Sequence, residues 1–385
     1  VIGDPAVAHT YSGYGMSRLN SGEISYLFAG KFGKILQPLQ LQEYRVFRYF
    51  NVVLFGFLLL IAAYKKPFRI LLLPLLLSPQ IWYIFSYFNS EAFAMVVILL
   101  IGYQMVVPNS AWNRLLSSEG NCRWWELVSI IILLGVLLLL KVNFYFFGIY
   151  IFFYFIWRLL FKKTAFNTTI LIRVALVALA GISFFVGVRV FDSSINDFEK
   201  SARIMEARET YADEIFKPST PLEKKFIYLQ MKDRGVTLGT IIHAHLWGEK
   251  IFRSSFGEYG YTSVAASYGY YDFVRYLSVL ALLIASFFAI KNGGWEGLGL
   301  VVITFVSALL LILGALYQAW TADFQAQGRY LLPIVGMLSM FAYHMREKLS
   351  NLPCAVVLAG MYVVSLYSFI FVGLAGIAKA TAAIG

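Results

Sequence analysis

The stretch ILIRVALVALAGISFFVGVRV (residues 170–190) is followed at Phe191 by a hydrophilic segment that continues to Arg275. An apolar run of this kind is long enough to cross the hydrocarbon core of a bilayer as a helix, which takes about 20 residues. The segment after it mixes charged residues with many aromatic and apolar ones, which is typical of a folded domain and not of a disordered linker. The junction predicts a membrane protein with one substantial polar domain on one face.

Apolar runs of similar character occupy most of the remaining chain. With 59% hydrophobic, 17% aromatic and only 14% charged residues, the composition excludes an ordinary water-soluble fold. We predict an all-α polytopic membrane protein with about ten transmembrane helices, several of them short. The predicted spans are residues 46–64, 70–88, 92–107, 127–140, 144–161, 170–190, 276–290, 298–317, 330–344 and 354–375.

Basic residues are concentrated in the short loops on one side of these spans. The short connections on the other side hold only Lys141 and Arg329. The positive-inside rule makes the basic side cytoplasmic, so the net charge of +11 reflects topology and not nucleic-acid binding. The basic side carries Lys65, Lys66, Arg69, Arg114, Arg123, Arg158, Lys162, Lys163, Lys291, Arg346 and Lys348.

Four regions follow from this topology. Residues 1–45 form an outer N-terminal loop, 46–190 a first bundle of about six spans, 191–275 an extracytoplasmic loop domain, and 276–385 a second bundle of about four spans. Within the loop domain we predict amphipathic helices at 222–231 and 238–252, lying along the membrane surface. Because the N-terminus is then outside and the chain starts at Val1 and not at Met, we expect one further helix upstream.

Two pairs of residues on the predicted outer face each contain a carboxylate that is a candidate catalytic acid or base. Asp4 and His9 place a carboxylate close to an imidazole, which suits proton transfer or a divalent cation, although an Asp before Pro also forms turns. Asn89 and Glu91 begin an outer helix, where capping and the helix dipole account for both residues as well as catalysis does.

A basic motif lies at the outer start of a later span. In Gln327–Gly328–Arg329–Tyr330, the guanidinium of Arg329 has the geometry to clamp a phosphate through two parallel hydrogen bonds, or to reach the interface as a snorkelling side chain. Glycines alternate with aromatic residues at 256–261 and 267–271, which fits either an interfacial aromatic belt or a surface for sugar or lipid.

Other motifs are missing from the sequence, and this narrows the classes of activity. There is no Walker-type phosphate loop, no Gly-x-Ser-x-Gly elbow and no His-Glu-x-x-His. The only cysteines, Cys122 and Cys354, both fall on the cytoplasmic side, where we expect them to be reduced packing residues. The sequence therefore excludes the familiar routes of nucleotide hydrolysis and identifies no certain cofactor.

Four short motifs stand out along the chain. They are Ser-Pro-Gln at 78–80, Ser-Tyr-Phe-Asn-Ser-Glu-Ala at 86–92, Ser-Phe-Gly-Glu-Tyr-Gly at 255–260 and Gln-Ala-Gln-Gly-Arg-Tyr-Leu-Leu-Pro at 325–333. Together they resemble a bacterial family of uncharacterised multi-pass membrane proteins that has a Gln-Gly-Arg-Tyr signature, and the last of the four motifs is the most specific. The family is related to the C-type glycosyltransferases, and the resemblance extends from about residue 44 to residue 353.

The resemblance implies a C-type arrangement of helices in the bacterial inner membrane, with the large loop outside. It implies transfer of a sugar from a polyprenyl-phosphate carrier to a glycan, lipid or protein acceptor, with bilayer lipids as further partners and no nucleic acid. It also implies a catalytic acid in the first outer loop, roughly where Asp4 stands, followed by a histidine that His9 resembles. Pro5 stands where the family tends to carry Glu, so this acid, or one upstream of Val1, is the expected base.

In the mechanism that we expect, basic and acidic side chains have separate roles. Arg329, assisted by Arg253, neutralises the departing phosphate, while Asp4 or Glu91 activates the acceptor. Glu258 accepts hydrogen bonds from sugar hydroxyls. Asn89 and Gln327 complete the expected substrate-binding set.

Two other classes of function stay open at this stage. One is a polymerase or ligase of lipid-linked polysaccharide, which also combines many spans with a large outer loop. The other is a membrane carrier or a scaffold subunit without catalytic activity, although the spans show neither a two-half repeat nor a row of acids in mid-membrane.

Overall fold

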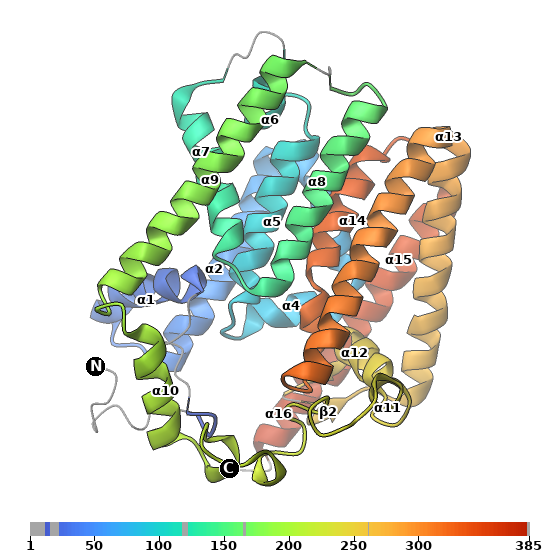
Figure 1. Ribbon diagram of the computed structural model, residues 1–385. Helices are drawn as coiled ribbons and strands as arrows, with labels where there is room; N and C mark the ends of the chain where they lie inside the picture. The colour runs from blue at the N-terminus through green and yellow to red at the C-terminus, as the bar shows by residue number, and fades with distance from the viewer. Residues whose placement is uncertain (1–11, 16–22, 118–121, 165–166, 261, 383–385) are drawn as a thin grey trace.

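The computed structural model describes residues 12–15, 23–117, 122–164, 167–260 and 262–382, and these residues form an almost entirely helical protein (Figure 1). The only strands in this part of the chain are β1 (Glu258–Tyr259) and β2 (Val264–Ala265), an antiparallel pair in which Glu258 lies opposite Ala265. The prediction of an all-α protein is confirmed.

Long apolar helices alternate with short helical segments before the polar segment. They are α1 (Ile24–Leu36), η3 (Gln37–Leu39), α2 (Glu43–Tyr64), α3 (Lys66–Leu72), η4 (Leu73–Leu77), α4 (Pro79–Ser86), α5 (Glu91–Val106), α6 (Ala111–Leu115), α7 (Trp124–Leu138), η5 (Val142–Phe144), α8 (Tyr145–Leu160) and α9 (Thr168–Ser194).

The polar segment itself holds shorter elements, and apolar helices then resume. In order these are α10 (Lys200–Tyr211), η6 (Glu214–Phe216), η7 (Leu222–Lys224), α11 (Leu238–His243), α12 (Trp247–Phe256), α13 (Tyr268–Thr321), η8 (Gly328–Leu331), α14 (Pro333–His344), α15 (Leu352–Tyr367), the π-helical η9 (Ser368–Leu374) and α16 (Ala375–Ala382).

Five helical segments among the described residues are long and apolar enough to cross a bilayer. Two helices bent by 99° at a short break, Lys66–Leu77 and Pro79–Ser86, would together make a sixth. This identifies a membrane-embedded helical protein. The five segments are Arg45–Tyr64, Val142–Leu160, Thr168–Ser194, Tyr268–Thr321 and Leu352–Ala380.

Helix α13 is 54 residues long because it consists of two arms that fold back on each other. Gly294 turns the chain with φ 57° and ψ −139°, a conformation that is essentially restricted to glycine. A Cβ atom on Gly297 would lie 2.0 Å from the carbonyl oxygen of Ala289, so glycine also allows the two arms to approach closely. The arms contain the predicted apolar runs 276–290 and 298–317.

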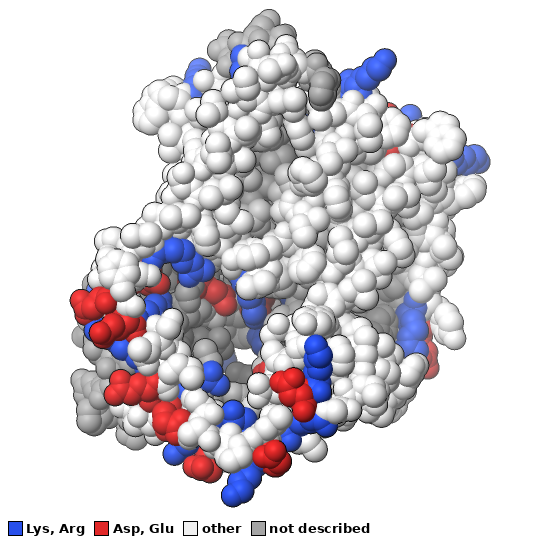
Figure 2. All heavy atoms as spheres, in the orientation of Figure 1, with Lys and Arg blue, Asp and Glu red and all other residues white. Residues whose placement is uncertain are grey.

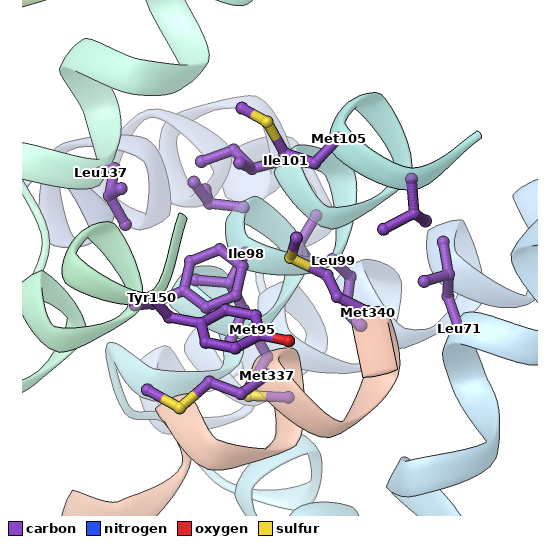
Figure 3. Close-up of a cluster of buried hydrophobic side chains, with 14 of the residues drawn as sticks. Leu71, Met95, Ile98, Leu99, Ile101, Met105, Leu137, Tyr150, Met337 and Met340 are labelled. Carbon is purple, nitrogen blue, oxygen red and sulfur yellow. The ribbon is translucent and has the colours of Figure 1, made fainter. Parts of the chain in front are cut away.

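Helix α5 is the centre of the hydrophobic core. Figure 3 shows its side chains Met95, Ile98 and Leu99 packed against Met337 and Met340 of α14. These five side chains are almost completely buried, with exposed fractions of 0–1%. A helix surrounded by protein on all sides is apolar around its whole circumference, as α5 is.

The structure differs from the prediction in two places within the polar segment and in one place in the N-terminal region. Residues 222–231 form no helix beyond the short η7, because their backbone bonds to the chain just after α13: Gln230 N–H donates to Ala322 O at 2.9 Å, and Tyr228 O accepts from Phe324 N–H at 3.0 Å. The predicted helix 238–252 is divided into α11 and α12 at Leu246, whose φ is 53°. The N-terminal region is not only a loop, since it contains α1.

A small second core fixes this polar segment to the bundle. Its buried members come from the segment and from the second arm of α13: Met231, Ile241, Trp247, Ile251, Leu316 and Ala319. The polar segment is therefore packed on the membrane helices, and its position relative to the second arm of α13 is fixed.

Candidate functional site

Three of the four sequence motifs meet around Ser255. Gly328 of η8 donates its backbone N–H to Ser254 Oγ of α12 at 2.7 Å. A Cβ atom on Gly328 would lie 2.6 Å from the backbone nitrogen of Ser255, so no larger residue fits without a shift. The carbonyl of Ser255 accepts a hydrogen bond from Ser78 Oγ at 2.5 Å, and Ser78 caps α4. The glycine of the Gln-Gly-Arg-Tyr motif thus allows η8 to pack directly on α12, and this contact fixes the backbone that carries Arg329.

The fourth motif supplies the carboxylate that lies nearest to Arg329. Glu91 begins α5 and its side chain is 2% exposed. Its Oε1 lies 2.8 Å from Lys141 Nζ and 3.7 Å from Arg329 Nε. Lys141 comes from the short connection between α7 and η5, and its Nζ lies 4.8 Å from the centre of the Tyr330 ring. Residues 91, 141 and 329 therefore form a charged cluster, which we call the outer cluster.

The outer cluster carries more positive than negative charge. One carboxylate faces two cations, which leaves a net charge of +1 when all three groups are ionised. Burial lowers the pKa of Arg329, but Glu91, Tyr330 and Tyr87 together raise it by more, so the guanidinium is held firmly in its charged form. Its Nε is buried without a hydrogen-bond partner among the described residues. A buried donor of this kind has a strong preference for an acceptor, and an anion satisfies both the donor and the charge.

Tyrosines surround the outer cluster. Tyr87 lies in the turn before Glu91, and its pKa is raised first by burial and then by the carboxylate, while Arg329 opposes the shift. Tyr330 donates its hydroxyl to Gln325 Oε1 at 2.5 Å, and Gln325 in turn donates to Asp323 Oδ2 at 2.5 Å. Neutral tyrosine hydroxyls keep the site polar without adding negative charge.

Asn89 has a structural position in the same turn. Its Oδ1 accepts from Ala92 N–H at 2.9 Å and so caps α5, and its Nδ2 donates to Tyr87 O at 2.9 Å. A second amide, Asn51 of α2, donates to Tyr87 O at 2.6 Å. Both asparagines are buried, with exposed fractions of 5% and 0%. Their contacts hold the turn that positions Glu91.

Arg253 and Glu258 bind each other on the neighbouring helix and strand. Arg253 Nε lies 3.0 Å from Glu258 Oε1, and its guanidinium lies between the rings of Tyr268 and Tyr271, at 5.2 and 5.1 Å. Burial raises the pKa of Glu258, although Arg253 opposes the shift. The two residues thus form a close ion pair, and the ion-pair distance from Arg253 Nε to its carboxylate, 3.0 Å, is shorter than the 3.7 Å from Arg329 Nε to Glu91. The Nε atoms of both arginines are buried without a hydrogen bond among the described residues.

The aromatic-glycine segment packs into the protein. Tyr259 is 1% exposed, its ring meets that of Tyr83 edge to face at 5.1 Å, and its hydroxyl lies 2.9 Å from Ser368 Oγ. Gly373 leaves room for it, since a Cβ there would lie 3.0 Å from the Tyr259 ring. The described part of the segment therefore joins α4 to the π-helical turn η9.

The remaining predicted residues are less informative. Gln327 precedes η8, and its backbone carbonyl accepts from Tyr330 N–H at 3.1 Å. Asp4 and His9 lie outside the described residues. Within the described ranges, no group of three His, Cys, Asp or Glu side chains is arranged to hold a metal ion.

The sequence already contained a signal for Lys141, which was not among the predicted site residues. It is the only basic residue besides Arg329 in the short connections of the predicted outer side. Figure 2 shows a hollow in the half of the molecule that holds the polar segment, beside α10 and below a wide band with almost no charge. Side chains of both signs surround its mouth.

No family model, no curated protein and no solved structure matches the chain.

Proposed function

We propose that the protein is a membrane glycosyltransferase that takes a sugar from a polyprenyl-phosphate donor on the extracytoplasmic face. The single observation that carries this proposal is the outer cluster, with two cations around one carboxylate and a buried Nε on Arg329 that has no hydrogen bond among the described residues. The phosphate of such a donor is a diester with one negative charge. It would neutralise the net charge of the cluster and supply the missing acceptor.

The proposal includes a topology. The shorter helices α5, α7 and α14, the bent pair of α3 and α4, and the two arms of α13 cross the bilayer together with the longer helices, which gives about ten crossings. The polar segment, the outer cluster and η8 then lie outside the bacterial inner membrane, in an arrangement like that of the C-type enzymes. The wide uncharged band in Figure 2 supports this placement, because lipid chains would cover it.

The proposed reaction is a displacement at the anomeric carbon. An acceptor oxygen forms the new bond to this carbon, the bond between the carbon and the phosphate oxygen breaks, and the phosphate keeps the electron pair. Arg329 and Lys141 stabilise the charge that develops on the phosphate. The proton of the acceptor hydroxyl passes to a carboxylate, for which Asp4 and Glu91 are the two candidates.

The test is transfer by purified protein from a panel of radiolabelled polyprenyl-phosphate sugars. We expect Arg329→Ala to weaken donor binding and to lower turnover by about 100-fold, as loss of a charge-stabilising donor does. Arg346→Ala is the matched control, because Arg346 also lies over a tyrosine ring, 4.5 Å from that of Tyr343, in a different loop. Arg346→Ala should keep wild-type transfer.

Other outcomes would favour other functions. Donor binding without transfer to any simple acceptor, together with accumulation of unpolymerised repeat units in cells, would support a polymerase or ligase. If the wild-type protein binds no donor of the panel, or if Arg329→Ala leaves donor affinity and transfer unchanged, the proposal is wrong and a carrier or scaffold becomes the better hypothesis.

A further inference from the structure

Helix α1 has an apolar and basic face that is largely exposed. Leu27, Phe28 and Ile35 are 57%, 44% and 74% exposed, and Lys31 and Lys34 are exposed as well. Positions 27, 28, 31, 34 and 35 follow the spacing of a single helix face. Among the described residues, neither lysine forms an ion pair with a carboxylate.

The position of α1 places this face at the edge of the bilayer. Helix α2 contains the span Arg45–Tyr64 and begins shortly after α1, and the N–H of Ile24 donates to Leu139 O, just after the end of α7. Figure 1 shows α1 lying across the axes of the long helices, at the end of the bundle where the polar segment lies. Large apolar side chains at this depth enter the boundary between headgroups and acyl chains, as in other interfacial helices.

We infer that α1 is a binding surface for anionic phospholipid headgroups of the bilayer. Leu27, Phe28 and Ile35 insert among the acyl chains, and the ammonium groups of Lys31 and Lys34 pair with lipid phosphates and the negative charge of the headgroup. The two lysines stand three residues apart, so both reach the same layer of headgroups. This surface is independent of the proposed sugar transfer.

The surface also adjoins the turn that carries Glu91. The ring of Phe28 stacks on Phe93 at 5.2 Å, and the ring of Tyr26 meets that of Phe88 at 5.7 Å. Phe88 and Phe93 stand on either side of Glu91 in the sequence. Lipids bound to α1 therefore lie beside the turn that supports the outer cluster.

The experiment uses a fluorophore on α1 and lipids that quench it. Gly30 is suited to the label, because it is exposed and a Cβ there would meet no atom within 4 Å. Gly30→Cys is labelled after Cys122 and Cys354 are replaced by serine, and the protein is reconstituted with spin-labelled phosphatidylglycerol or phosphatidylcholine. At about 1 kcal/mol for each lysine near the surface, the preference for phosphatidylglycerol should reach about 30-fold.

Variants then separate charge from burial. Lys31→Gln with Lys34→Gln should reduce the preference for phosphatidylglycerol to about one while quenching by phosphatidylcholine persists, and arginine at both positions should retain the preference. The control is Lys65→Gln with Lys66→Gln, at the far end of α2. It should change neither the preference for phosphatidylglycerol nor the quenching by phosphatidylcholine. Equal quenching of the wild-type protein by the two lipids, or no quenching by either, would overturn the inference.

Discussion

The Nζ atom of Lys141 lies 2.8 Å from Oε1 of Glu91, although 50 positions separate the two residues. The carboxylate is almost fully buried, so it depends on Lys141 and on the more distant Arg329 for compensation. We expect Lys141→Met to lower the free energy of unfolding by about 2–3 kcal/mol, less than for a fully buried pair, because Arg329 stays. Thermal unfolding in detergent measures this change.

A second pair provides the control for this prediction. Lys163 Nζ lies 3.0 Å from Glu296 Oε2, but its side chain is 42% exposed and that of Glu296 is 31% exposed. Solvent screens such a pair, so Lys163→Met should cost about 0–1 kcal/mol. Adding Glu91→Gln to Lys141→Met should recover part of the lost stability. Equal melting temperatures for Lys141→Met and the wild-type protein would refute the account of the outer cluster.

Gly328 is expected to be intolerant of any side chain. Its Cβ would lie 2.1 Å from Ser255 Oγ and 2.6 Å from the backbone nitrogen of the same residue. Because backbone cannot rotate away, Gly328→Ala must displace η8 and lose the hydrogen bond to Ser254, at a cost of about 2 kcal/mol or more. The thermal midpoint should fall, and Arg329 should become more accessible to arginine-modifying reagents.

Gly30→Ala is the control for Gly328→Ala, because its added methyl group would enter open space. No atom lies within 4 Å of its Cβ position, and alanine favours a helix over glycine by about 1 kcal/mol. It should raise the midpoint slightly or leave it unchanged. If Gly328→Ala behaves in the same way, the close contact between η8 and α12 is not a constraint on the protein.

The helical class and most apolar segments follow from the sequence because they depend on local composition. The run at 170–190 lies within α9 (Thr168–Ser194), and a bilayer requires this kind of segment whatever its neighbours are. Residues 222–231 show the limit of such reasoning. Their apolar spacing suits a helix, but Gln230 N–H and Tyr228 O bond to residues just after the second arm of α13, and no local pattern shows these partners.

The candidate site was predictable only as a set of positions on one face. The alternation of spans placed residues 89–91, Lys141 and Arg329 on the same side, and the structure brings them together. The contact between Ser78 and Ser255 joins positions 177 residues apart, so the sequence gives no sign of it. Arg253 and Glu258 were predicted to bind substrate separately, but no spacing rule showed that they would bind each other.

Two adjacent glycines at the bend of α13 are expected to respond differently to alanine. Gly294 has φ 57° and ψ −139°, where a Cβ atom is strained, and Gly294→Ala should cost about 1–3 kcal/mol. At Gly293 the nearest atom to a new Cβ is Met345 Sδ at 3.7 Å, an ordinary contact, so Gly293→Ala should cost little. Similar melting temperatures for the two variants would contradict the assignment of the bend to Gly294.

Asp323 should make the protein less stable as the pH rises. Burial raises its pKa above the ordinary value of 3.8, against a smaller opposing effect of the hydrogen bond from Gln325. The folded state therefore holds this proton more tightly than the unfolded state, and the stability that depends on it is present below the unfolded pKa and lost as pH rises through the folded one. Unfolding midpoints between pH 4 and pH 7 should fall more steeply in the wild-type protein than in Asp323→Asn, which keeps an uncharged group at this position. Parallel curves would show that folding does not change the pKa of Asp323, and a steeper fall in Asp323→Asn would show that folding lowers it; either result would contradict the prediction.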